Sequence, residues 1–449
     1  MARRKALKST AALAVATILQ LSCSGQGRGD PALVRFWALG REGEVVRELI
    51  PEFERRNPGV HVELQQIPWV AAHEKLLTAF VGHATPDVAQ IGNTWISEFS
   101  ALGAIAPLDE DLRTGHEIDR GDYFPGSWDA NIVDDVTWGV PWYVDTRVIF
   151  YRTDLVAESG AAWPPHTWSE WREAMRKVKA HVGKDRFAIL LPIDEWEKPV
   201  LLGMQTGAEL LSDGGRHGAF RDPRFRTALD FYAGLFTEKL APPLTYSGVA
   251  NLYQQFAEGY FAMLITGPWN LGEFRDRLPP AMQDRWSTTP MPAPDGSGSY
   301  PGTSLAGGSS LVLFRSGSTK PAAWRFIEFL SAPDQQVRFH ELTGNLPARR
   351  SAWDRTNLAD DPRSAAFRLQ LSALRPLPKV PECEQIALRV ADAAEQVVRG
   401  ARTLDGALEL LDHDVDRILG KRRFMLDRAA ARANVNRGAA GATSGGGDP

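Results

Sequence analysis

Hydrophobic and polar positions follow a regular pattern between residues 33 and 102. The pattern predicts strands over 33–37, 60–64 and 87–91 and helices over 42–56, 70–81 and 95–102. Strands that alternate with helices predict a parallel sheet covered by helices on both faces. Ligands of such sheets bind beyond the carboxyl ends of the strands, so the loops after Phe36, Ile67 and Ile91 are predicted to contribute to a binding site.

A β-prone stretch over 138–151 is interpreted as a hinge crossing into a second lobe. Beyond it, the pattern predicts helices over 168–181, 201–211, 225–236 and 251–258, with strands over 187–191 and 260–266. A loop over 291–301, rich in Pro, Gly and Ser, precedes a β run at 311–314 and a helix over 320–331, and amphipathic helices follow over 384–398 and 403–419. The predicted organisation is a signal peptide 1–22, a tether 23–31, an N-terminal lobe 32–141 and 285–313, a C-terminal lobe 142–284 and 314–428, and a disordered tail 429–449.

The N-terminus has the features of an export signal. Arg3, Arg4 and Lys5 precede an apolar run over 11–21, which is about half the length of a bilayer-spanning helix. The segment over 19–25 resembles a bacterial lipobox, with small Ser22 before Cys23, which would be diacylated. Gln20 departs from the usual Leu, so cleavage at a neighbouring bond and a plain secreted protein stay as alternatives.

Composition narrows the class of protein. Of the 449 residues, more than 400 follow the predicted signal, and 43% of the chain is hydrophobic, which predicts two or more folded lobes. The net charge is −4, and Lys and Arg are scattered, so no basic stripe for nucleic acid is present in the sequence. Cys383 is the only cysteine besides Cys23, so lipidation of Cys23 would exclude an internal disulfide.

Motifs for catalysis or metal binding are missing from the sequence. The nine His residues are spread singly, without an HExxH motif or a Cys cluster, so no metal site is predicted. The run over 307–310 is Gly-rich but lacks the GK[ST] ending of a phosphate-binding loop, and no G-x-S-x-G elbow occurs. Asp194, Glu195 and Glu197 could form a glycosidase pair, although solvated acidic runs are far commoner.

Aromatic residues supply the more informative signal. Of fourteen Trp residues, six fall at strand ends or in loops: Trp37, Trp69, Trp95, Trp142, Trp196 and Trp269. A flat indole suits the C–H face of a pyranose, whose hydroxyls need polar partners. The candidate partners are Glu42, Glu44, Asn93, Asp145, Asn270, Ser309 and Arg349. The alternatives are core packing for each loop Trp, favourable first-turn charges for Glu42 and Glu44, and a surface charge for Arg349.

Six segments in order resemble the extracellular solute-binding proteins of bacterial carbohydrate ABC importers, solute-binding family 1, the class that includes maltose-binding protein. They are Phe36-Trp37 with 54–58, then 85–88, 139–147, 165–168, 262–269 and 343–349. The resemblance implies a type II periplasmic-binding-protein fold, α/β with two lobes, each a central β-sheet flanked by helices, joined by a hinge.

The resemblance also implies residue roles. Trp269 would stack on the sugar, Asp145 would accept hydrogen bonds from sugar hydroxyls, and Asn93 would add a polar contact, although many relatives carry Asp there. Gly308, in the Gly307-Gly308 turn, and Arg349 would make contacts on closure of the lobes.

The implied function is binding of a mono- or oligosaccharide and its delivery to the permease subunits of an importer. The protein is then expected to be an exported monomer without enzymatic activity or cofactor, in the periplasm or at the outer face of the cytoplasmic membrane, with membrane contact only through the lipid on Cys23. The alternatives are a binding protein for a polyol or glycerol phosphoester, a secreted glycosidase, and a lipid-tethered adhesion protein.

Overall fold

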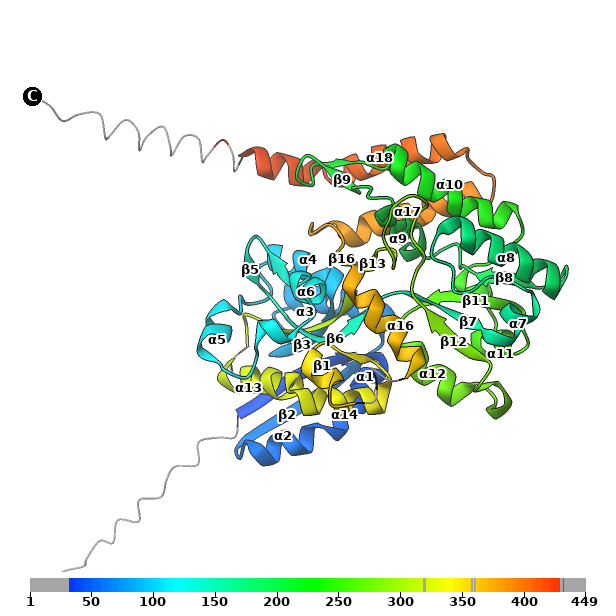
Figure 1. Cartoon of the computed structure of the whole chain (residues 1–449). Helices are drawn as coiled ribbons and strands as arrows, with labels where there is room; N and C mark the ends of the chain where they lie inside the picture. Colours follow the sequence, from blue (N-terminus) through cyan, green and yellow to red (C-terminus); the bar gives the residue numbers. More distant parts are fainter. Residues whose placement is uncertain (1–31, 318–319, 357, 359–360, 429–430, 432–449) are drawn as a thin grey trace, which may run out of the picture.

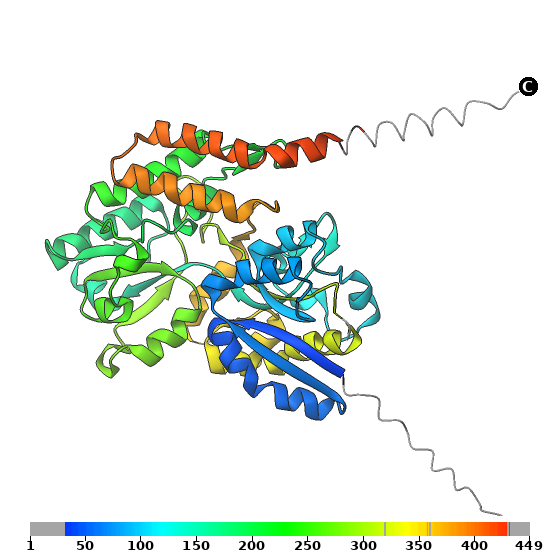
Figure 2. The ribbon, with the colours of Figure 1, turned by 180° about the vertical axis from the view of Figure 1, so that it is seen from behind.

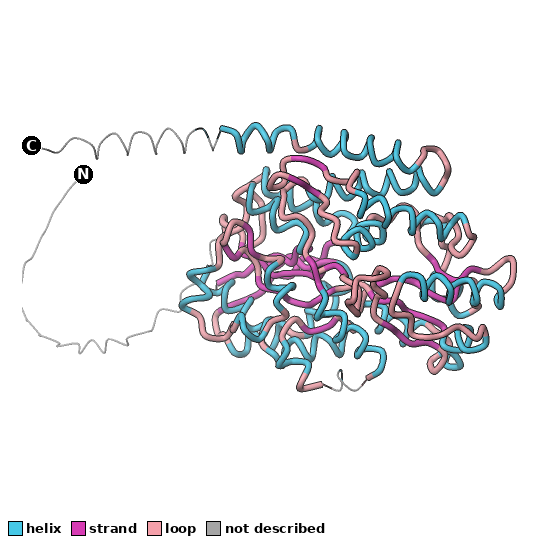
Figure 3. The backbone as a smooth tube through the Cα atoms, turned by 45° about the horizontal axis from the view of Figure 1, so that its top comes forward, coloured by secondary structure: helices cyan, strands magenta, loops and turns pink. Residues whose placement is uncertain are grey.

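The computed structural model describes residues 32–317, 320–356, 358, 361–428 and 431 (Figure 1). The predicted signal peptide, Cys23, the tether and all of the predicted tail except residue 431 lie outside these residues. Two β-sheets form the centres of two lobes, and helices surround both sheets (Figures 1 and 3). The predicted α/β fold with two lobes is therefore confirmed.

The first lobe is built on a six-stranded sheet with the strand order β15-β6-β14-β3-β1-β2. Its strands are β1 (Ala32–Leu39), β2 (Val60–Ile67), β3 (Val88–Gly92), β6 (Val140–Asp145), β14 (Gly307–Leu313) and β15 (Leu346–Pro347). β1 pairs in parallel with β2 and β3, as the alternating pattern predicts, but β14 and β15 are antiparallel to their neighbours. The sheet is mixed because β14 enters it from the second lobe, so it runs opposite to β6, which leaves toward that lobe.

Helices cover both faces of this sheet (Figures 1 and 2). They are α1 (Gly40–Val45), α2 (Ile50–Arg56), α3 (Trp69–Val81), α4 (Ile96–Ala101), α13 (Lys320–Ser331) and α14 (Pro333–Thr343). Side chains alternate along β1, so Val34 and Phe36 face a core that includes Phe53 and Phe326. The single helix expected over 42–56 is instead divided into α1, a 3₁₀ turn and α2. Pro51 explains the division, because it lacks an N–H and begins a new helix more easily than it continues one.

The second lobe is built on a four-stranded sheet with the order β12-β7-β11-β8. Its strands are β7 (Val148–Arg152), β8 (Phe187–Leu190), β11 (Phe261–Thr266) and β12 (Trp286–Thr289). The helices of this half of the molecule are α7 (Thr153–Glu158), α8 (Trp168–Val182), α9 (Glu197–Gln205), α10 (Pro223–Thr237), α11 (Leu252–Ala257), α12 (Trp269–Arg277), α16 (Pro362–Gln370), α17 (Cys383–Val398) and α18 (Leu404–Ile418). The pattern predicted a helix over 201–211, but α9 begins four residues earlier, at Glu197, and ends at Gln205. It ends there because Gly207 has a positive φ of 76°, which a helix cannot continue through.

Short elements complete the chain. They are α5 (Asp109–Thr114), α6 (Pro125–Asp129), β4 (Ile132–Val133), β5 (Val136–Thr137), β9 (Leu211–Ser212), β10 (His217–Gly218), β13 (Ser304–Leu305), α15 (Arg350–Trp353) and β16 (Leu374–Arg375). None of the helices within the described residues has the length and apolar composition needed to span a bilayer.

The chain divides between the lobes differently from the expected ranges. β12 pairs with β7 in the second sheet, and only β14 of the range 285–313 joins the first sheet. α13 and α14 follow β14 and pack on the first lobe, where Phe326 lies 5.2 Å from Phe36 between ring centroids. Side-chain packing accounts for the difference: Trp286 of β12 stacks on Phe150 of β7, whereas α13 completes the core beneath β1.

Candidate functional site

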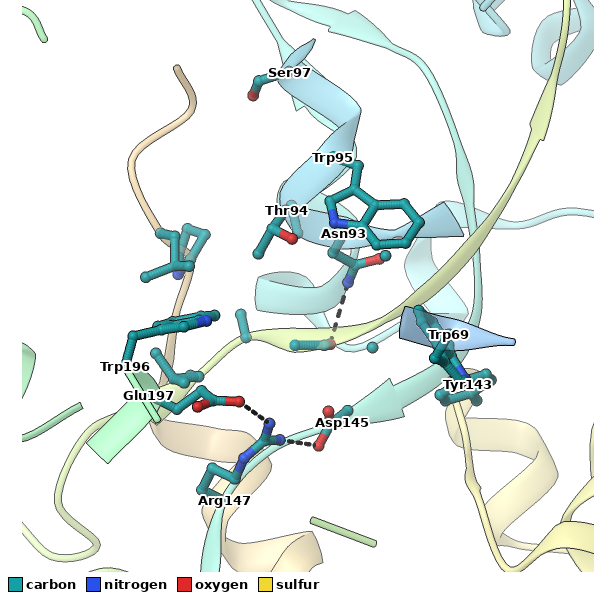
Figure 4. Close-up of a pocket in the computed structure, with 18 of the residues that line it drawn as sticks. Trp69, Asn93, Thr94, Trp95, Ser97, Tyr143, Asp145, Arg147, Trp196 and Glu197 are labelled. Atoms are coloured by element: carbon teal, nitrogen blue, oxygen red, sulfur yellow. Dashed lines mark hydrogen bonds and ion pairs between the residues drawn. The ribbon is translucent and has the colours of Figure 1, made fainter. Parts of the chain in front are cut away.

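A cavity of about 560 Å³ lies between the two sheets. Glu42, Trp69 and Asn93 follow β1, β2 and β3, so all three loops expected at the binding site contribute side chains to it. Arg147 and Trp196 line it from the side of the second lobe (Figure 4), and Trp269 lines it from the same side. The cavity therefore lies at the carboxyl ends of the parallel strands, where open α/β sheets bind ligands.

The Glu42 carboxylate is held by neutral hydrogen-bond donors. The hydroxyl of Tyr143 donates to Oε1 at 3.0 Å, the amide of Asn345 donates to Oε1 at 3.1 Å, and the indole N–H of Trp69 donates to Oε2 at 3.3 Å. Burial raises the pKa of the Tyr143 hydroxyl well above its usual value, and the adjacent Glu42 charge adds to the effect, so this group stays a donor. These four residues, which we term the Glu42 cluster, fix an acceptor at one wall of the cavity.

Charged groups hold the floor of the cavity. Arg147 donates from Nη1 to Oδ1 of Asp145 at 2.6 Å, and its Nη2 lies 3.5 Å from Oε1 of Glu197 (Figure 4). Asp145 ends β6 and Glu197 begins α9, so Arg147 joins carboxylates from the two halves of the molecule. We term these three residues the Arg147 cluster.

The pKa values of the three residues of the Arg147 cluster are shifted in different directions. Burial raises the pKa of Asp145, against the opposing charge of Arg147. Burial also acts to raise the pKa of Glu197, but Lys198 and Arg147 outweigh it, and that pKa is lowered. Burial disfavours the charge on Arg147, yet the two carboxylates raise its pKa, so the guanidinium stays protonated. The floor of the cavity is thus a buried ionic network.

Four indoles line the cavity from opposite sides. Trp69 and Trp95 belong to the first lobe and meet edge to face at 5.9 Å, whereas Trp196 and Trp269 belong to the second. The Trp269 ring lies over the Arg147 guanidinium at 4.8 Å, and 37% of this residue is exposed. Its position requires Gly267, because a Cβ at that residue would lie 1.9 Å from the ring.

Asn93 and Gly308 line the cavity, although the Asn93 amide is already engaged by the protein. Its Nδ2 donates to the carbonyl of Gly307 at 3.2 Å, and its Oδ1 accepts from Ser310 at 2.8 Å. Gly308 has a φ of +124°, and a Cβ there would lie 2.5 Å from the Tyr143 carbonyl oxygen. Glycine at this position lets β14 approach β6 closely enough to shape the wall.

Of the residues predicted from the sequence, eight line the cavity: Glu42, Trp69, Asn93, Trp95, Asp145, Trp196, Trp269 and Gly308. Six do not: Trp37, Glu44, Trp142, Asn270, Ser309 and Arg349. For two of these six, strand alternation explains the difference. Trp142 directly precedes the cavity residue Tyr143 in β6, so its side chain points to the opposite face, where it stacks on Phe339 at 4.3 Å. Trp37 of β1 faces α3, with the Lys75 ammonium 5.2 Å from its ring.

The other four predicted residues bond within the protein. Glu44 is exposed and accepts from Gln66 at 3.1 Å, and Asn270 donates to the Thr266 hydroxyl at 2.7 Å beneath α12. The Ser309 hydroxyl donates to the carbonyl of Ile91 at 2.9 Å. Arg349 donates to Asp122 at 2.7 Å and therefore joins two segments of the first lobe away from the cavity.

Several residues that line the cavity were not among the predicted site residues. Tyr143 and Arg147 belong to the same 139–147 segment as Asp145, so its alternating pattern could have indicated them. Glu197 was considered only within an acidic run, as one carboxylate of a glycosidase pair. Asn345 belongs to the 343–349 segment noted above, but that segment does not single it out as a site residue. The segment 376–379, which forms a further wall, has no local signal, because tertiary packing alone brings it to the cavity.

The cavity suits a neutral polar ligand with apolar faces. Indoles offer flat surfaces for C–H groups, while carboxylates and a guanidinium offer oriented partners for hydroxyls. Within the described part of the chain, no group of His, Cys, Asp and Glu side chains is arranged to hold a metal ion.

Comparisons with known proteins agree with this geometry. Residues 37–337 match the family model described as bacterial extracellular solute-binding protein. The chain is similar to the sugar-binding protein MalE from the phytopathogen Xanthomonas citri, with 46% identity and a TM-score of 0.83 over 88% of this chain and 99% of that chain.

Two further relatives have lower identity. A galactooligosaccharide-binding protein of Bacillus subtilis is 24% identical over 86% of this chain and 89% of its own length. A maltooligosaccharide ABC transporter solute-binding lipoprotein of Streptococcus pneumoniae is 23% identical over 85% of this chain and 90% of its own length. The similarity thus extends over most of the chain in each case.

Proposed function

The chain belongs to the bacterial extracellular solute-binding proteins, and from this membership we propose that it binds a sugar between its lobes and delivers it to an ABC-type importer. One observation carries the proposal: indoles from both lobes face a cavity whose carboxylates and guanidinium are already oriented by hydrogen bonds. A pyranose needs this combination, with stacking surfaces for its C–H faces and fixed partners for its hydroxyls. The family and the fold are those of binding proteins, and we propose no catalytic step.

Closure of the two lobes over the sugar provides the mechanism. A ligand shifts the balance between open and closed forms only by its difference in affinity for them, so contacts from both lobes are required. Glu42 and Trp69 offer contacts from the first lobe, and Trp196 and Trp269 offer them from the second. We place the hinge at the crossing from β6 to β7, between Asp145 and Val148, because this segment joins the two sheets.

The closed form would then dock on the permease subunits as a monomer. The family is extracellular, and we propose that the mature protein is tethered by a lipid on Cys23 in the periplasm or at the outer face of the cytoplasmic membrane. The pneumococcal relative bears the name lipoprotein, which supports the tether. Mass spectrometry of the mature N-terminus tests this: a diacylglycerol on Cys23 is expected, and a free N-terminus without lipid would contradict it.

A sugar is favoured over the alternative ligands. A glycerol phosphoester would require cations that are free to meet its charge. The cavity lining holds two cations, Arg147 and Lys379, against three carboxylates, Glu42, Asp145 and Glu197. Arg147 is already paired with Asp145 and Glu197, so the lining has no excess positive charge to offer a phosphate. The same pairing argues against a glycosidase. Its two carboxylates would have to act on water and on the scissile bond, whereas Asp145 and Glu197 are both paired with Arg147.

Binding to a panel of sugars and polyols tests the function. We expect at least one mono- or oligosaccharide to raise the melting temperature of the protein and to give saturable heat in calorimetry. Asp145→Asn should weaken that binding by at least about tenfold, because a hydroxyl would lose a charged acceptor. A panel in which only a phosphoester binds would favour the alternative ligand, and release of product sugars from oligosaccharides would favour a glycosidase.

A further inference from the structure

An ion pair joins the two lobes beside the sugar cavity. Arg41 of α1 donates from Nη1 to Oε1 of Glu273 at 2.8 Å, and its Nη2 lies 3.4 Å from Oδ2 of Asp276. Both carboxylates belong to α12, which follows β11 of the second sheet, whereas α1 follows β1 of the first. The contact therefore bridges the two lobes in the arrangement that the structure shows.

The two helices of this ion pair also carry cavity residues. Arg41 directly precedes Glu42, and Glu273 lies one helical turn after Trp269. The ion pair thus connects the backbone that holds a polar acceptor to the backbone that holds a stacking ring. Its atoms do not line the cavity, so its effect on a sugar must come through Glu42 and Trp269.

The electrostatics of Arg41 suit a contact of modest strength. Burial acts to lower the pKa of Arg41, but hydrogen bonds and charge from Glu273 and Asp276 outweigh it, and the pKa is raised. The Arg41 side chain is 42% exposed and that of Glu273 is 15% exposed. Water and salt therefore reach the pair and weaken it, which makes its contribution adjustable by ionic strength.

From this geometry we infer that Arg41 is a positioning residue for ligand binding: its ion pair with Glu273 and Asp276 favours the arrangement of the lobes seen in the structure over a more open one, and so raises sugar affinity without touching the sugar. The inference rests on the sugar-binding function proposed above. It also predicts that the affinity for a neutral sugar depends on salt concentration. Contacts to the neutral sugar alone would not produce this dependence, because they involve no net charge on the ligand.

A double-mutant cycle tests the inference. Arg41→Gln and Glu273→Gln should each weaken binding of the best sugar of the panel by about two- to fivefold, and the double variant by less than the product of the two. In wild type the affinity should fall as NaCl rises from about 0.02 M to about 0.5 M, and Arg41→Gln should remove most of that dependence. Additive effects, or an unchanged salt dependence in Arg41→Gln, would overturn the inference.

Arg226→Gln is the matched control. Arg226 pairs with Asp405 at 2.6 Å, has a similarly exposed side chain, and joins α10 to α18 within the second lobe. Its substitution should leave both sugar affinity and its salt dependence unchanged. An equal loss of affinity in Arg226→Gln would show that removal of any surface charge suffices, which contradicts a specific role for Arg41.

Small-angle scattering of the sugar-free protein separates this inference from the proposed function. At low salt, Arg41→Gln should have a larger radius of gyration than wild type, because the open arrangement becomes more populated. If no sugar binds the wild type, the proposed function fails while this measurement still reports on the ion pair. An identical radius of gyration in the two proteins at low salt would refute the inference even if sugar binds.

Discussion

The Glu42 cluster and the Arg147 cluster present carboxylates to the same cavity but stabilise them differently. Glu42 is held by neutral donors, all from the first lobe and its adjoining segments. Asp145 and Glu197 instead share one buried cation that lies between the halves of the molecule. The comparison indicates that one wall is organised independently of lobe closure, whereas the floor depends on how the two halves meet.

Removal of the shared cation should have the largest effect. Arg147→Ala removes the buried cation that two largely buried carboxylates share, and Lys198 remains near only Glu197, so the free energy of unfolding should fall by about 3–5 kcal/mol. Chemical denaturation followed by tryptophan fluorescence measures this change, and sugar binding should be lost as well. An unfolding free energy within about 1 kcal/mol of wild type would show that the network is not a buried ionic one.

Arg152 provides the control for that variant. It is a buried arginine paired with Asp154 at 2.7 Å in the second lobe, and it does not line the cavity. Arg152→Ala should destabilise the protein to a comparable extent while the folded fraction keeps its sugar affinity. Loss of binding in both variants would mean that instability, not the cavity, explains the effect.

Trp269→Ala should act on binding with little effect on stability. The ring is partly exposed and covers Arg147, so its removal takes away a stacking surface and opens the floor to water. We expect sugar affinity to fall by about 2 kcal/mol, which is roughly thirtyfold, in calorimetry. Tyr246→Ala, at an exposed aromatic that does not line the cavity, should leave the affinity unchanged. Equal losses in both would contradict the placement of the stacking site.

Glu42→Gln should have a smaller effect than Arg147→Ala or Trp269→Ala. The side chain keeps its shape but replaces one acceptor oxygen by an NH₂ group, which cannot accept from Tyr143, Asn345 or Trp69. The free energy of unfolding should fall by about 1–2 kcal/mol. Sugar affinity should fall too, and by a similar factor at low and high salt, because Glu42→Gln removes no ion pair. A strongly salt-dependent loss would erase the distinction between the two clusters.

The smallest expected effect is a pH dependence of the melting temperature that comes from His73, a residue of α3 that packs against the cavity residue Trp95. The hydrogen bond from Nε2 of His73 to Oε2 of Glu98, at 2.6 Å, raises the pKa of His73, whose ring lies 5.1 Å from that of Trp95. Because the pKa is raised in the folded state, the stabilisation is fully present below about pH 6.5 and is lost as pH rises through the higher folded value. Melting temperatures of wild type and His73→Gln should therefore differ at pH 6 and converge at higher pH, with exposed His116→Gln as the control. A constant difference across this range would show that His73 acts by packing alone.

The local pattern of the chain established the order of elements and several cavity loops. Period-2 and period-3.6 spacing depend on neighbouring residues, so the strands around β1, β2 and β3 and the helices α8 and α17 were predicted close to their observed bounds. Trp269 could be predicted because Gly267 and Pro268 give its loop a distinctive local pattern, and Asp145 because its strand leads into the crossing.

Tertiary structure alone decided which polar residues meet. Asn345 lies 303 positions from Glu42 in the chain, and Arg147 lies 50 from Glu197, so no local spacing indicates either contact. Strand alternation turned Trp142 into the core and Tyr143 toward the cavity, a choice that depends on which face of β6 the second lobe covers. Local pattern determines what a segment becomes, because the relevant forces act within a few residues, whereas the composition of a site between lobes depends on packing across the whole chain.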